Sequence, residues 1–134
     1  NDSSFTREEY LEFINKANIS CNLFVGEVHG GTTHVEAMMA RNIMIAPNIN
    51  AYKFKYEQSN NMDYPFIFEL TNGEIDTDVL AQKMAMAVNT VLDGNNLQYG
   101  ELNRDLAFEY ESYEKRVDKV VEDLRSIIKL PAEV

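Results

Sequence analysis

The segment ISCNLFVGEVHGGTTHVE, residues 19–36, carries a strand signal and a helix signal on either side of a turn. Apolar residues recur at every second position over residues 19–25, with the period of two that is typical of a strand. Ile19, Cys21, Leu23 and Val25 alternate with Ser20, Asn22 and Phe24. Thr33, followed three residues later by Glu36, forms a capping box, which predicts a helix over residues 33–46. The segment therefore predicts a strand–turn–helix unit.

Outward from this unit, the remaining signals mark alternating strands and capped helices. Residues 51–56 and 64–70 both place aromatic side chains at alternate positions, so they predict the two strands of an antiparallel hairpin. Thr6 and Glu9 form another capping box, which predicts that a helix begins after Thr6. Further elements are predicted over residues 76–92 (helix), 98–104 (short helix), 106–108 (brief strand) and 110–128 (long helix).

This order of elements indicates an α+β domain. A strand, a helix, two strands and a second helix form a βαββα core, close to the ferredoxin-like split βαβ arrangement. We expect a three- to four-stranded, mainly antiparallel sheet with amphipathic helices packed on it. The length of 134 residues fits a single domain over residues 1–134.

The composition excludes several classes of protein. The formal net charge of -10 opposes binding to nucleic acid or to an anionic membrane, and it permits binding to a basic protein surface. Cys21 is the only cysteine, so the chain forms no internal disulfide. Because no apolar run is long enough to cross a membrane and the first residues form no secretory signal, we expect a cytoplasmic protein.

The turn before the predicted helix is the candidate ligand site. Glycine lets the backbone approach a ligand closely, and the following helix presents free N–H groups and its positive dipole end to an anion. The turn has neither the Gly-Lys-Ser/Thr of a P-loop nor the G-x-G-x-x-G spacing of a dinucleotide fingerprint. The alternative is that its glycines only shape a tight turn. The candidate binding residues are Gly26, Glu27, His29, Gly30, Gly31, Thr32 and His34.

His29 and His34 are the only histidines in the chain. Together with a nearby glutamate, two imidazoles can hold a metal ion or move a proton. Their spacing matches none of the strong zinc patterns, so we predict no metal site, and the alternative is a pair of partly exposed surface histidines. No Ser-His-Asp or Cys-His motif accompanies them, so we assign no catalytic residues and expect no complete catalytic set.

Three segments resemble the C-terminal domain of the auxin-responsive acyl-acid amido synthetases, an adenylate-forming family. The matching segments are LFVGE at residues 23–27 with THVEA at 33–37, YPFIFEL at 64–70, and residues 88–99 with Leu92, Asn96 and Tyr99. They are similar to the family's strand ending in Gly-Glu with its His-Val-x-x-Ala helix, its aromatic strand ending in Glu, and its helix-then-Asn-x-x-Tyr pattern. The chain departs from the family at Asn103, where the family has Arg, in its longer loop over residues 29–32, and in lacking a clear final strand and Gly-Thr-Phe segment.

The resemblance implies an accessory domain of an acyl-adenylate-forming ligase. Such a chain would be the C-terminal domain of a longer protein, partnered by a large adenylating domain that conjugates a carboxylic acid to an amino acid. The small domain would hold no cofactor of its own, because ATP and Mg²⁺ would be bound through the large domain. As an enzyme, the chain would be at most part of an ATP-dependent acid–amino acid ligase.

Two other functions stay open at the level of sequence. The acidic charge and the lack of a catalytic set are typical of a free-standing protein-interaction or inhibitor module that binds a basic protein. The glycine-containing turn instead favours a small anion-binding or nucleotide-binding protein that uses residues 26–34.

Overall fold

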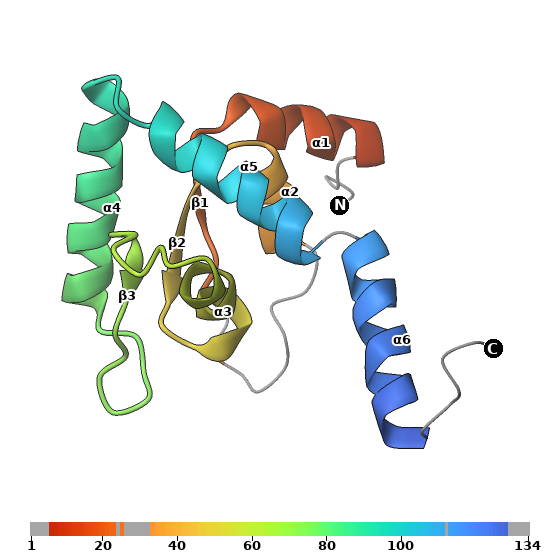
Figure 1. The fold of residues 1–134 in the computed structure, drawn as a ribbon. Coiled ribbons are helices and arrows are strands. Elements are labelled where there is room, and N and C mark those ends of the chain that lie inside the picture. Colours follow the sequence, from red (N-terminus) through yellow and green to blue (C-terminus); the bar gives the residue numbers. More distant parts are fainter. Residues whose placement is uncertain (1–5, 24, 26–32, 112, 129–134) are drawn as a thin grey trace.

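The computed structural model describes residues 6–23, 25, 33–111 and 113–128 (Figure 1). The described chain combines helices with a small sheet, which confirms the coarse α+β prediction. The elements are, in order, α1 (Arg7–Lys16), β1 (Ile19–Cys21), α2 (Thr33–Met39), β2 (Ile43–Pro47), α3 (Asn50–Gln58), β3 (Ile67–Phe68), α4 (Thr77–Leu92), α5 (Leu97–Glu111) and α6 (Tyr113–Ile128).

The three strands form a parallel sheet in the order β1-β2-β3. Ile19 pairs with Ile43, and Ala46 pairs with Ile67. The predicted antiparallel hairpin and mainly antiparallel sheet are therefore wrong, and the ferredoxin-like arrangement is not observed. The described chain instead contains a βαβαβ unit, in which α2 connects β1 to β2 and α3 connects β2 to β3.

The helix predicted over residues 33–46 ends early and gives way to β2. Arg41 takes the left-handed conformation with φ 66° in the turn between α2 and β2. The residues of β2 are all buried, as in the central strand of a parallel sheet. A short continuous apolar run has no periodicity that separates a strand from a helix, which explains the wrong prediction.

The strand predicted over residues 51–56 is helix α3. Its buried side chains include Tyr52, Lys55 and Tyr56, which are three and four residues apart and therefore share one helix face. Lys53 lies 3.6 Å from Glu57, a pair with the spacing of one helical turn. The strand prediction was therefore wrong, because the side chains that are buried follow the spacing of a helix and not the alternation of the aromatic residues.

β3 is much shorter than the strand predicted over residues 64–70. Beside it, the side chain of Tyr64 makes the hydrogen bonds to β2 that a longer strand would make. The Tyr64 hydroxyl donates to the Met44 carbonyl oxygen at 2.7 Å and accepts from the Met44 N–H at 2.9 Å. Asn103 Nδ2 donates to the same hydroxyl at 3.1 Å and to the Asn42 carbonyl oxygen at 2.9 Å, and the Tyr56 hydroxyl donates to Asn103 Oδ1 at 2.7 Å. Tyr64 thus pairs the backbone of β2 where β3 does not reach.

Helix α5 replaces the short helix and brief strand predicted over residues 98–108. It packs against α2, α3 and β2 (Figure 1). Gly100 allows close contact with the turn before β2, because a Cβ there would lie 2.5 Å from the Arg41 carbonyl oxygen. The buried Asn103 then ties α5 to the start of β2.

The capped helices agree with their sequence signals. α1 begins after Thr6, and the capping box between Thr6 and Glu9 is present. Asp76 caps α4 by accepting from the Asp78 N–H, and Gly94 follows this helix with φ 75°. The long C-terminal helix predicted from residue 110 is divided between α5 and α6, and α6 extends away from the sheet (Figure 1). No helix in the described ranges is both long and apolar enough to span a lipid bilayer.

Candidate functional site

The carboxyl ends of the parallel strands meet at one edge of the sheet, which we call the carboxyl edge. Asn22 follows β1, Asn48 follows β2 and Glu69 follows β3. Helices α2 and α3 both start from this edge, since each is the crossover to the next parallel strand. Open sheets with parallel strands bind ligands outside the carboxyl ends of their strands. The edge is therefore the first place to look for a site.

Asn48 and Glu69 connect the ends of β2 and β3. The Asn48 N–H donates to the Phe68 carbonyl oxygen at 2.7 Å, and Asn48 Nδ2 donates to the Glu69 carboxylate. Asn48 Oδ1 is buried and has no hydrogen-bond partner among the residues that the structure describes. Because buried polar atoms in proteins are generally hydrogen-bonded, this oxygen marks a place for a donor.

The first turn of α3 follows Asn48 directly. Its N-cap residue is Ile49, and no side chain caps this end by a hydrogen bond in the described part of the chain. An uncapped helix start leaves backbone N–H groups and the positive end of the helix dipole available to an anion. The start of α3 therefore favours negative charge.

A buried cluster of His34, Tyr52 and Lys55 joins α2 to α3. The His34 ring meets the Tyr52 ring edge-on, with 5.3 Å between their centroids, and His34 is only 2% exposed. Lys55 is 0% exposed, and its Nζ donates to the Tyr52 carbonyl oxygen at 3.3 Å. Lys55 Nζ also lies 5.0 Å from the centroid of the Phe54 ring.

Of the predicted site residues, only His34 lies in the described part of the chain. It is buried, so the alternative of a partly exposed surface histidine is wrong for His34. The other predicted residues lie outside the described residues, namely Gly26, Glu27, His29, Gly30, Gly31 and Thr32. The sequence did not point to Asn48, Lys55 or Glu69. A strand assignment for the apolar run before Asn48 would have placed Asn48 at the carboxyl edge.

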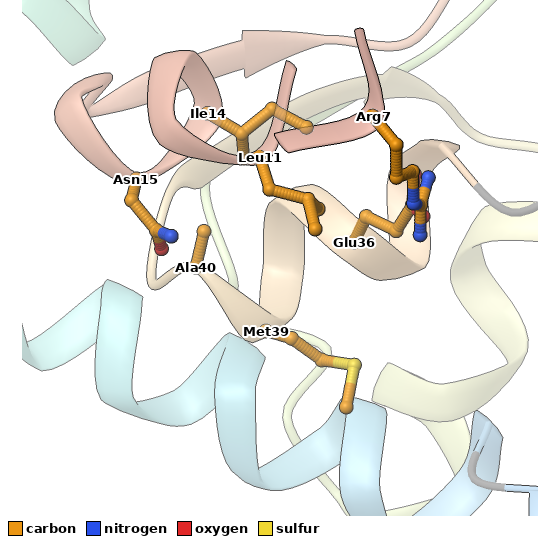
Figure 2. A pocket seen from close by; sticks show the side chains of 7 residues that line it. All are labelled: Arg7, Leu11, Ile14, Asn15, Glu36, Met39 and Ala40. Atoms are coloured by element: carbon orange, nitrogen blue, oxygen red, sulfur yellow. The ribbon is translucent and has the colours of Figure 1, made fainter. Parts of the chain in front are cut away.

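A groove of about 250 Å³ lies between α1 and α2 (Figure 2). At one end Arg7 Nη2 lies 2.6 Å from Glu36 Oε2. The side chain of Thr33 lies outside the described residues, so the predicted capping box between Thr33 and Glu36 stays a prediction. The Glu36 carboxylate binds Arg7. The ion pair between Arg7 and Glu36 holds α1 against the first turn of α2. Burial, followed by the charge of Glu36, raises the pKa of the nearby Tyr10 hydroxyl.

No family model, curated protein or solved structure matches the chain. Within the described ranges, no group of three or more His, Cys, Asp and Glu side chains is placed to hold a metal ion.

Proposed function

We propose that the chain binds the phosphate groups of a nucleotide at the carboxyl edge. The observation that carries the proposal is the parallel pairing of the strands, because it brings the starts of α2 and α3 to one edge. The glycine-containing segment over residues 26–32 joins β1 to α2 in the sequence. A βαβαβ unit is the mononucleotide-binding half of doubly wound folds, and phosphates bind there at helix starts.

The charges near this edge support an anion as the ligand. The chain as a whole carries -10, which repels anions, so an anion site needs a local source of positive potential. The starts of two helices lie at this edge and supply it. We propose that the Lys55 ammonium group on α3 adds to it. The His34 imidazole adds a buried hydrogen-bonding group beside Tyr52.

Polar groups beside the helix start favour a nucleotide over inorganic phosphate. Asn48 Oδ1 and the Glu69 carboxylate are hydrogen-bond acceptors, and acceptors recognise the hydroxyl groups of a ribose. A carboxylate after a neighbouring strand holds ribose hydroxyls in dinucleotide-binding folds. We therefore place the phosphates at the start of α3 and the sugar toward Glu69.

The accessory domain of an acyl-adenylate-forming ligase is one form of this proposed function. The family resemblance implies it, and it places a nucleotide at the same edge. That form additionally requires a large adenylating domain as partner, and it predicts no turnover by the present chain alone. A free-standing nucleotide-binding protein requires no such partner.

Calorimetric titration with ADP, UDP, adenosine and inorganic pyrophosphate at low salt tests the proposal. Lys55→Met removes the buried charge but keeps an unbranched apolar side chain, and we expect it to weaken ADP binding by about tenfold, or 1.4 kcal/mol. Lys53→Met is the matched control, because Lys53 lies on the same helix and pairs with Glu57. We expect that control to keep ADP affinity within about twofold.

Two outcomes would contradict the proposal. One is adenosine binding as tightly as ADP, which would show that the phosphate groups contribute nothing to binding. The other is an equal loss of affinity in both lysine variants, which would assign the effect to net charge. His34→Gln gives a second variant, should Lys55→Met fail to fold, and we expect it also to weaken ADP binding.

A further inference from the structure

The outer edge of β1, on the side away from β2, has unpaired backbone groups. The Asn18 carbonyl oxygen accepts from the Ile43 N–H at 2.8 Å, and the Asn22 N–H donates to the Ile45 carbonyl oxygen at 2.9 Å. Because alternate residues of a strand point their backbone groups in opposite directions, those of Ile19 and Cys21 face the outer edge. β1 is an edge strand of the sheet in the described part of the chain, so no further strand pairs with these groups there.

A groove of about 270 Å³ runs between this edge and α1. Apolar residues in its lining include Tyr10, Phe13 and Ile14 on α1 and Ile19 on β1, and polar residues also line it. Phe13 is 61% exposed at the groove.

Asn42 supplies a buried polar atom to the same groove. The residue is 2% exposed and lines the groove, and its Oδ1 has no hydrogen-bond partner in the described part of the chain. The carbonyl oxygen of Asn42 is already bound by Asn103, so the side chain is not needed for that contact. Burying a carboxamide oxygen unpaired is unfavourable, so the groove is built for a ligand that donates a hydrogen bond.

We propose that an extended polypeptide segment binds at this edge and adds a strand beside β1. Its backbone pairs with Ile19 and Cys21, while an apolar side chain enters the groove and a donor reaches Asn42 Oδ1. Backbone groups repeated at strand spacing are the chemistry that such an edge recognises. The chain's net charge of -10 favours a segment with basic residues on both sides of the apolar one. This site is separate from the proposed nucleotide site.

Hydrogen exchange with a synthetic peptide tests this interaction. The probe is the capped peptide KVTLTVK, which alternates apolar and small polar residues between lysines. At saturation we expect the Ile19 and Cys21 amides to gain at least about tenfold protection from exchange. The Asn22 amide, already bonded to β2, is the internal control and should change little. Absence of peptide binding at millimolar concentration would overturn the proposal.

N-methylated peptides separate strand addition from simple filling of the groove. Two versions carry N-methyl groups at alternate residues, in opposite phase, so only one loses the N–H groups that face β1. We expect that version to bind at least about tenfold more weakly than the other. Equal binding by both versions would overturn strand addition. Asn42→Leu should also weaken the unmethylated peptide, and unchanged affinity would remove Asn42 from the site. No nucleotide is present, so failure here leaves the proposed function intact.

Discussion

Replacing Tyr64 by phenylalanine is expected to lower the free energy of unfolding by about 3–5 kcal/mol. The change removes one oxygen and keeps the ring. The Met44 N–H, the Met44 carbonyl oxygen and Asn103 Nδ2 would each lose a hydrogen bond in a fully buried setting. Asn103 Nδ2 keeps its bond to the Asn42 carbonyl oxygen, so the two Met44 groups are the ones left unpaired. Each buried polar group left unpaired costs about 1–3 kcal/mol, which is why one hydroxyl has so large an effect.

Urea unfolding followed by circular dichroism measures this loss, with Tyr99→Phe as the matched control. The Tyr99 ring packs against the same aromatic residues, with 5.2 Å between its centroid and that of Phe66. Its hydroxyl makes no hydrogen bond in the described part of the chain, so we expect a loss below about 1 kcal/mol. Equal losses in the two variants would show that Tyr64 does not complete the edge of β2.

The protein is expected to unfold in alkaline solution as the buried tyrosines ionise. Burial raises the pKa of Tyr64 to about 12, and burial followed by the neighbouring Tyr64 raises the pKa of Tyr56 well above 10.0. The unfolded chain releases these protons first, so the stabilisation is complete below about pH 10 and is lost as the pH rises through about 12. For Tyr64 alone it amounts to about 3 kcal/mol.

Parallel titrations of tyrosinate absorbance and helical circular dichroism test this expectation. We expect the exposed tyrosines to ionise first, with no loss of helix, and the last absorbance change to coincide with unfolding. In Tyr64→Phe, unfolding should begin at lower pH, because less stability remains to be lost. Ionisation of every tyrosine near pH 10 in a chain that stays folded would contradict the buried network.

The starts of α1 and α4 were predictable from sequence because their signals are local. Thr6 with Glu9, and Asp76 alone, satisfy backbone N–H groups within one turn, so a few adjacent residues decide where α1 and α4 begin. The end of α4 has an equally local cause, because Gly94 readily takes the left-handed conformation that follows the helix.

The sheet was not predictable in the same way because its pairing depends on distant residues. The aromatic residues around Tyr52 alternate in sequence, yet burial against α2 and α5 selects the helical spacing of Tyr52 and Tyr56. Tyr64 pairs with Met44 across 20 positions, and no local pattern encodes that contact. Tertiary packing therefore outweighed the local period in the centre of the chain.

The candidate site was partly predictable. The position of His34 after a glycine-containing turn pointed to the start of α2, which does lie at the carboxyl edge. Asn48, Lys55 and Glu69 were missed because their roles follow from parallel pairing, and the predicted hairpin placed their segments in antiparallel strands. A lysine between two aromatic residues also gives no sequence sign that it is buried.

The most direct test of the account is a nitrogen–proton NMR titration of the labelled chain with ADP. Phosphate binding at the carboxyl edge predicts the largest shift changes at the backbone amides of His34, Asn48 and Ile49, with smaller ones near Glu69. Asn42 lies before the start of β2, at the edge opposite the carboxyl edge, and Gly100 packs beside Arg41 near it. The chemical shifts of their amides should hardly change. Largest changes at Asn42 and Gly100, or no change at Asn48 and Ile49 under saturating ADP, would contradict a nucleotide site at the carboxyl edge.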